Sequence, residues 1–230
     1  MKNSRRFLAV ARLIALALCG TATAGTLVVG TPADLGNCFP FGCDYDGFTP
    51  SGIYQQVYTS SLFSGPMTIT GLEFYDTKYG SGDAMNTGTF TISLSTTASD
   101  WNTLSGTPAN NIGADNTQVF TGSLAQPWAL GDTLSIMFST PFTYTPGYGA
   151  NLLLNIVATG TGYGGGIIYF DTNAQNTFFG REYENGTVDS GFGLVTGFDY
   201  SDQVGTPEPA SFVLLAAGLA GLSLLRKRLS

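Results

Sequence analysis

The sequence predicts an all-β fold, a two-sheet sandwich of jelly-roll type, and three observations lead to this class. Short runs alternate apolar and polar residues, as in residues 89–95, where Phe90, Ile92 and Leu94 share one face. No window between residues 25 and 205 carries an apolar stripe of helical period. Turns rich in Gly and Pro separate the runs at hairpin spacing, which is typical of sandwiches.

Eight runs are the expected strands, taken in chain order. They are residues 54–62, 67–75, 89–95, 119–124, 133–138, 151–156, 167–170 and 192–200. In residues 67–75 the apolar parity changes at Gly71, which predicts a β-bulge or bend at that position. The expected strands fill residues 25–205, which is enough for one sizeable core and favours one domain over two.

Residues 1–24 have the pattern of a secretory signal peptide. Basic residues come first, an apolar core follows, and Ala22 and Ala24 form a small-x-small cleavage site before Gly25. We therefore expect the chain to be exported and the β-domain to begin near Gly25.

The last 25 residues, 206–230, combine three features in a fixed order. Pro207, Glu208 and Pro209 come first, residues 210–225 carry no charge and are almost wholly apolar, and the basic triplet Arg226-Lys227-Arg228 follows. As a helix the apolar run is about 24 Å long, slightly less than a hydrocarbon core of about 30 Å. Lys and Arg next to an apolar span stay in the cytoplasm, so the run predicts a single transmembrane helix with residues 25–205 outside.

The Pro-Glu-Pro motif, apolar helix and basic tail resemble the PEP-CTERM sorting signal of Gram-negative, exopolysaccharide-producing bacteria. The resemblance implies recognition by a membrane protease, the exosortase. It also implies an inner-membrane precursor that later reaches the cell surface or extracellular matrix. Thr206 stands where the family usually has Val or a small apolar residue. An ordinary C-terminal anchor is the alternative, and it leaves Glu208 without a role. The β-domain resembles a recurrent ectodomain of such proteins, to which the resemblance attaches no activity.

Charge is divided unevenly along the chain. Residues 25–205 hold two basic residues, Lys78 and Arg181, against fifteen acidic ones, a net charge of −13. A field of this sign repels nucleic acid and anionic polysaccharide unless cations bridge them. The composition therefore excludes a nucleic-acid partner.

Two cysteines, Cys38 and Cys43, remain once the signal peptide is removed. In an oxidising compartment two cysteines separated by four residues are expected to form a disulfide. Cys19 lies within the signal peptide. A lipoprotein modified at Cys19 is the alternative, but Leu18 stands where a lipobox has Gly, Ala or Ser.

The residue types argue against catalysis. The chain has no histidine, which excludes Ser-His-Asp and Cys-His hydrolases and the common His-bearing zinc sites. A glycan hydrolase that needs only two carboxylates is the enzyme class that remains, and no sequence signal selects a pair. We therefore expect no enzyme activity and no organic cofactor.

Calcium is the one cofactor that the sequence suggests. Asp44 and Asp46, followed by Gly47, resemble the start of a calcium loop, although no Glu stands at the closing position. The alternative is an ordinary Asp- and Gly-containing loop.

A second ligand candidate is Trp101, which lies in a stretch rich in Asn, Ser and Thr and is expected to be exposed in a loop. An exposed ring of this kind can stack on a sugar, and the alternative is ordinary packing. Three functions follow from these observations. They are a non-catalytic surface or matrix protein associated with exopolysaccharide or biofilm, a module that binds extracellular polysaccharide, and, third, a carboxylate-based glycan hydrolase.

Overall fold

The computed structural model describes residues 24–32, 35–43, 51–78, 84–162, 164–184 and 186–202. Within these ranges the chain forms β-strands and two short 3-10 turns, with no α-helix. The elements are β1 (Ala24–Val29), β2 (Leu35–Asn37), β3 (Ser51–Tyr58), η1 (Ser60–Leu62), β4 (Met67–Tyr75), β5 (Thr87–Thr97), η2 (Pro108–Asn111), β6 (Thr117–Gly122), β7 (Thr133–Tyr144), β8 (Asn151–Gly162), β9 (Phe170–Asn173), β10 (Phe179–Tyr183), β11 (Thr187–Ser190), β12 (Gly193–Leu194) and β13 (Thr196–Asp202). No helix among these residues is long and apolar enough to cross a membrane.

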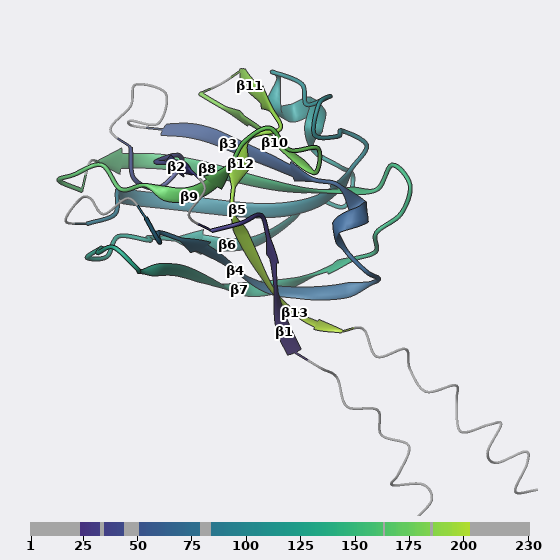
Figure 1. The fold of residues 1–230 in the computed structure, drawn as a ribbon, viewed down its shortest axis with the longest axis horizontal. Helices are drawn as coiled ribbons and strands as arrows, with labels where there is room; N and C mark the ends of the chain where they lie inside the picture. Colours follow the sequence, from purple (N-terminus) through teal and green to yellow (C-terminus); the bar gives the residue numbers. More distant parts are fainter. Residues whose placement is uncertain are drawn as a thin grey trace, which may run out of the picture. The chain divides into compact units, whose positions relative to one another are not determined.

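Two antiparallel sheets stack face to face (Figure 1). The larger has the order β11-β10-β3-β8-β5-β6, and the smaller has the order β1-β13-β4-β7. A third sheet, β12-β9-β2, has three short strands. The sheets also approach at one edge, where the Ser139 hydroxyl of β7 donates to the Val119 carbonyl of β6 at 3.1 Å. The predicted all-β, sandwich-like class is confirmed, and the jelly-roll type stays a prediction.

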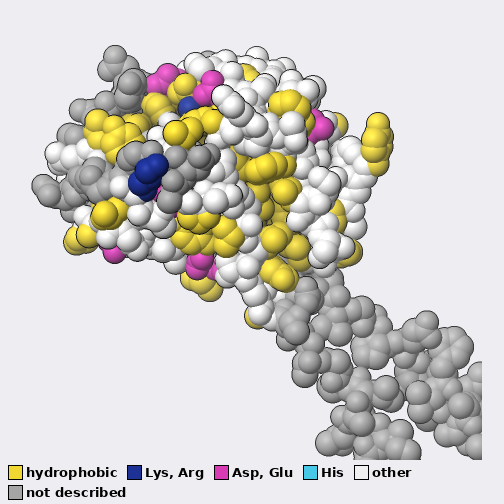
Figure 2. Space-filling model, in the orientation of Figure 1, with side chains coloured by type: hydrophobic (Ala, Val, Ile, Leu, Met, Phe, Trp, Pro, Cys, Tyr) yellow, Lys and Arg dark blue, Asp and Glu magenta, His cyan; other side chains and the backbone are white. Residues whose placement is uncertain are grey.

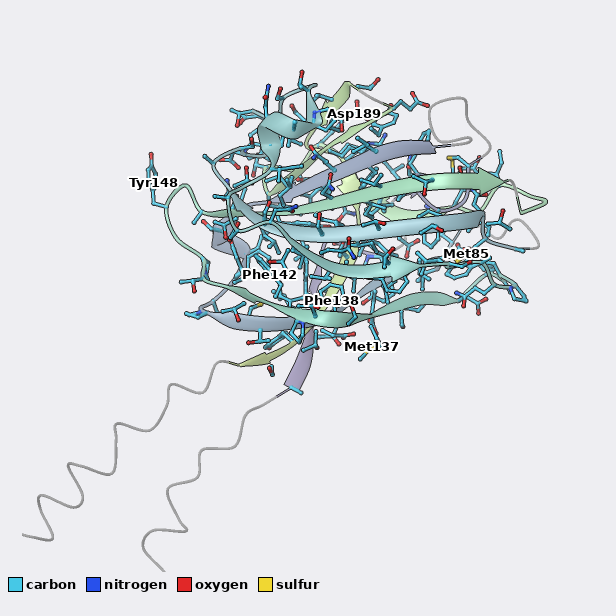
Figure 3. All side chains as sticks on the ribbon, turned by 180° about the vertical axis from the view of Figure 1, so that it is seen from behind. Met85, Met137, Phe138, Phe142, Tyr148 and Asp189 are labelled. Carbon is cyan, nitrogen blue, oxygen red and sulfur yellow. A yellow bond between two sulfur atoms is a disulfide. The ribbon has the colours of Figure 1, made fainter. Side chains whose placement is uncertain are left out.

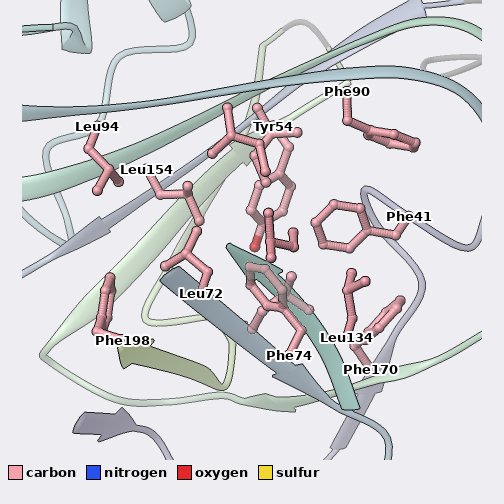
Figure 4. Packing of buried hydrophobic residues seen from close by; sticks show 14 of the residues in the cluster. Phe41, Tyr54, Leu72, Phe74, Phe90, Leu94, Leu134, Leu154, Phe170 and Phe198 are labelled. Atoms are coloured by element: carbon pink, nitrogen blue, oxygen red, sulfur yellow. The ribbon is translucent and has the colours of Figure 1, made fainter. Parts of the chain in front are cut away.

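The core lies between the two large sheets, and the alternation seen in the sequence explains it. In β7, Leu134 and Ile136 are buried, while Met137, the next residue along the strand, is 68% exposed. Figure 4 shows the buried side chains that meet from the two sheets. Those labelled are Phe41, Tyr54, Leu72, Phe74, Phe90, Leu94, Leu134, Leu154, Phe170 and Phe198.

Strand β8 is buried on both faces, because residues 98–116, here called the covering segment, lie over the outer face of the larger sheet. Leu153 on that outer face packs in a small cluster with Val57 and Leu104. The buried Gln55 amide holds the segment in place: it donates to the Pro108 carbonyl at 3.0 Å and accepts from Asn111 at 2.8 Å. In Figure 1 the covering segment and η2 lie beside β11.

The predicted disulfide is present between Cys38 and Cys43, whose Cα atoms are 5.0 Å apart. It closes a loop that inserts the fully buried Phe41 into the core. The Phe41 ring contacts Phe74 of the smaller sheet at 5.1 Å and Phe90 of the larger sheet at 5.6 Å between centroids. The loop is therefore part of the core.

Several strands follow the sequence prediction and others depart from it. Strand β4 has the predicted bounds, and its register with β7 shifts between Ile69 and Gly71, which confirms the bulge. The run 192–200 is divided into β12 and β13, because the Val195 N–H donates to the Asp171 carbonyl at 2.9 Å. Strands β1, β2, β10 and β11 lie outside the predicted runs.

The first and last strands pair with each other, with Ala24 opposite Ser201. A compact unit accordingly runs from Ala24 to Ser201. Ala24 and Gly25, at the predicted cleavage site, are the first two residues of β1, so cleavage after Ala24 removes only one residue of the strand. The assignment of residues 25–205 to one exported domain stays a prediction.

Candidate functional site

A cleft of about 520 Å³ lies where several loops of the sandwich meet. Residues from four segments line it: η1 with the preceding Thr59, the start of the covering segment, the β7–β8 turn, and Thr177 before β10. Its size falls within the range of small-molecule clefts, about 300–1,000 Å³. It combines two aromatic side chains with hydroxyl, amide and carboxylate groups.

Asn151, the first residue of β8, fixes two walls of the cleft to each other. Its side chain is nearly buried, and its Oδ1 accepts the Ser60 N–H at 2.8 Å. Its Nδ2 donates to the Ser99 carbonyl at 2.9 Å. A third wall is joined by the Thr59 N–H, which donates to the Phe178 carbonyl at 2.9 Å. Three walls of the cleft are thus pre-organised by hydrogen bonds.

Trp101 sits in a tight turn at the start of the covering segment. The Asp100 N–H donates to the Thr103 hydroxyl at 2.8 Å, and the Trp101 N–H donates to the Asp100 carboxylate at 2.8 Å. The Trp101 carbonyl lies against Gly180 of β10, where a β-carbon would collide with it. The predicted loop position of Trp101 is correct, but the side chain is half-buried in the cleft wall instead of fully exposed.

Tyr148 stands opposite, at the tip of the β7–β8 hairpin, and its side chain is fully exposed, at 109% of the reference area. Figure 3 shows it projecting away from the sandwich. The tip is a tight turn in which the Ala150 N–H donates to the Gly147 carbonyl at 3.0 Å and Gly149 takes a φ of +67°. The sequence analysis did not select Tyr148. Its place inside a Pro-Gly-Tyr-Gly turn was the available signal, because such a turn leaves little for the ring to pack against.

Among the described residues that line the cleft, Asp100 is the charged one, and neither Lys nor Arg is present. The face shown in Figure 2 carries few basic side chains, and Lys78 and Arg181 are the basic residues within the described ranges. Arg181 is buried, with its Nη2 2.8 Å from the Asp189 carboxylate and its guanidinium stacked 4.1 Å from the Tyr183 ring centroid. The described part of the cleft lining therefore offers one carboxylate and no compensating positive side chain.

A second polar feature lies close to the cleft wall but does not line it. Glu182 of β10 is fully buried, and no described residue gives its carboxylate oxygens a well-formed hydrogen bond. Burial raises the pKa of Glu182 to about 7, while the nearby Gly186 amide lowers it to a smaller extent. Glu182 is two residues from Gly180, so its side chain points to the face of β10 that carries the Trp101 turn.

The structure places Trp101 in the cleft, and most of the other predicted site residues lie outside the described ranges. Cys38 and Cys43 are structural. Asp44 and Asp46, Ala22, Pro207 to Pro209 and Arg226 to Arg228 lie outside the described residues. Among the residues that the structure describes, no three potential metal-ligating side chains cluster. Calcium binding at Asp44 and Asp46 stays a prediction.

Fold and cleft together define a sandwich-like β-domain with a pre-organised cleft between its loops. At the C-terminus, residues 206–228 match the family model of the PEP-CTERM protein-sorting motif. The match confirms the resemblance drawn from Pro207, Glu208 and Pro209, and it is consistent with an exosortase substrate. It implies export and processing of a membrane-anchored precursor.

The remaining comparisons add little. No curated protein matches the chain. Among solved structures, a chain in the crystal structure of the T13 IBDV viral particle is similar at 12% sequence identity, with a TM-score of 0.21. The similarity covers 84% of this chain and 42% of that one, so this chain spans less than half the length of the viral chain. A likeness of this size supports no conclusion on fold or function.

Proposed function

We propose that the chain is a secreted surface or extracellular-matrix protein, sorted by an exosortase-type membrane protease and associated with an exopolysaccharide or biofilm envelope. The observation that carries the proposal is the sorting motif at residues 206–228. Signal peptide and apolar helix hold the precursor in the inner membrane, and residues 25–205 reach the outside.

Glu208 provides the test of sorting. The two flanking prolines keep the segment extended and stop the helix from continuing through it, so the carboxylate is presented above the bilayer. Glu208→Ala and the nearly isosteric Glu208→Gln are both expected to leave full-length precursor in the inner membrane. The measurement is the size and fractionation of the protein in its native host. Mature-sized protein at the surface in both variants would refute the sorting proposal.

The proposal includes the absence of catalysis. A glycosidase of the common type needs a pair of carboxylates that flank the bond it cleaves, and Asp100 is the one carboxylate among the described residues that line the cleft. The competing glycan hydrolase predicts release of reducing sugar from extracellular polysaccharide. It also predicts loss of that activity in one acid-to-amide variant. No turnover is expected from the wild-type chain.

A second candidate function is favoured by a specific observation. Trp101 and Tyr148 border a cleft whose other walls carry hydroxyl and amide groups, the combination that a sugar ring requires of a binding site. In this reading the domain is a carbohydrate-binding module. Trp101→Ala and Tyr148→Ala should each lower retention on extracellular polysaccharide. Met137→Ala, which removes an exposed apolar side chain outside the cleft, should not.

A further inference from the structure

We infer that the cleft selects neutral glycans over uronic-acid-containing ones, and that Asp100 is the residue that sets this preference. The inference rests on the carbohydrate-binding function proposed above and names the class of sugar. It begins from the position of Asp100 beside Trp101, in the wall of a cleft that has no cation among its described lining residues.

The Asp100 carboxylate is held in place, and its hydrogen bonds within the chain use only part of its acceptor capacity. One oxygen, Oδ1, accepts the Trp101 N–H at 2.8 Å, and the Asp100 N–H is anchored on Thr103 at 2.8 Å. A carboxylate has about four acceptor positions on its two oxygens, so most of them are available to a ligand. A sugar hydroxyl that donates to this carboxylate forms a charge-assisted hydrogen bond, which is about twice as strong as a neutral one.

The ligand must then supply donors and no negative charge. A uronic acid placed on Trp101 brings its carboxylate within several ångströms of Asp100. Two like charges about 4 Å apart repel by about 1 kcal/mol even in bulk water, and by more in a partly dry cleft. A bridging cation or a Lys or Arg would relieve this repulsion. The described lining has no such side chain, and the net charge of −13 on residues 25–205 adds to the repulsion.

The other lining groups suit a neutral sugar. The Asn151 side-chain amide is hydrogen-bonded to the backbone of Ser60 and Ser99, so its role is to hold the cleft walls in place and not to contact the ligand. Thr59 and Ser61 are on the same wall, with their hydroxyl oxygens 3.2 Å apart, and can each donate or accept. The Tyr148 ring is fully exposed, so it can cover one face of a bound sugar.

The test titrates the full chain with neutral hexose oligomers and with uronic acid oligomers of the same length, by calorimetry in EDTA at low and high salt. The detergent must not be a glycoside, because its headgroup would compete. We expect binding of a neutral oligomer that salt hardly changes, and at least fivefold weaker binding of the uronate oligomer at low salt. Asp100→Asn should narrow this ratio fivefold or more, because it replaces the charge-assisted hydrogen bond to the neutral sugar by a weaker neutral one and removes the repulsion of the uronate.

Asp132→Asn is the matched control, since it removes the same charge at a residue that does not line the cleft. Two results would overturn the charge selection and leave carbohydrate binding intact. One is that the wild type binds the uronate oligomer as tightly as the neutral one. The other is that the ratio of neutral to uronate affinity changes equally in Asp100→Asn and Asp132→Asn. If neither oligomer binds, or if Trp101→Ala binds as well as the wild type, carbohydrate binding in the cleft itself is wrong.

Discussion

The backbone carbonyl of Trp101 lies against Gly180, so the Trp101 turn packs on a strand position that has no side chain. Gly180 pairs with Val57 of β3 on one side and with Ser190 of β11 on the other. The sheet therefore fixes the depth at which the Trp101 turn lies.

The first prediction follows from that contact. Gly180→Ala should lower the free energy of unfolding by about 1–3 kcal/mol, because the new methyl group must push the Trp101 turn outward. The same change should shift Trp101 fluorescence to the red and weaken glycan binding. Gly65→Ala is the control, since a β-carbon there meets no atom within 4 Å. Equal stability and emission in the two variants would show that the turn is not seated on Gly180.

The second prediction concerns pH. Burial raises the pKa of Glu182 to about 7 from an ordinary value of 4.5. Between pH 4.5 and pH 7, the Glu182 carboxyl is therefore protonated in the folded state and ionised in the unfolded state. The contribution of Glu182 to the free energy of unfolding is therefore fully present below about pH 4.5 and is lost as the pH rises through about 7. Glu182→Gln should therefore be more stable than the wild type by about 3 kcal/mol above pH 7, with little difference at pH 4.

Denaturant unfolding at pH 4, 6 and 8 measures this effect. Glu184→Gln is the matched control, because it removes the same charge two residues further on at a partly exposed position. A difference between Glu182→Gln and wild type that stays constant over the three pH values would contradict the assignment. Because Glu182 shares a strand face with Gly180, Trp101 emission is expected to follow the same pH range.

The sequence predicted strands correctly where one face of the strand is buried and the other is exposed to solvent. Leu134, Ile136 and Met137 show why, since an alternating pattern reports both the strand and its orientation. Strand β10 could not be found in this way. Its Arg181 and Glu182 are polar yet buried, because Arg181 pairs with Asp189 and Glu182 lies on the face toward the Trp101 turn.

Only one of the two aromatic residues of the cleft was predicted from the sequence, and the reason differs from that for β10. Trp101 was selected from its polar surroundings, but its partner Tyr148 is 47 residues away in the chain. Both residues line the cleft because β5 and β8 pair along their length, with Thr97 opposite Asn151, which brings the ends of two loops to the same end of the sheet. Long-range pairing of this kind is not encoded in local patterns.

The third prediction concerns Phe41. Phe41→Ala should destabilise the domain by about 3–5 kcal/mol, because its ring is fully buried and contacts Phe74, Phe90 and Phe170. Replacing Cys38 and Cys43 together by Ser should destabilise it by about 2 kcal/mol, since the loop that the disulfide closes is short. Thermal and denaturant unfolding of the two variants give the comparison. A larger loss in the double Ser variant would mean that the cross-link, and not the Phe41 ring, stabilises this loop.

The fourth prediction concerns the basic tail. We expect Arg226, Lys227 and Arg228 to hold the C-terminus in the cytoplasm, with each contributing about 1 kcal/mol through attraction to anionic lipid headgroups. Replacing all three by Gln should let the apolar run slip outward, so that the chain is lost from the inner membrane without being processed. A charge-preserving variant, with Arg226→Lys, Lys227→Arg and Arg228→Lys, should be processed like the wild type. Fractionation separates this defect from that of Glu208→Ala, whose precursor stays in the membrane. Normal processing of the triple Gln variant would show that the apolar run and Glu208 suffice for sorting.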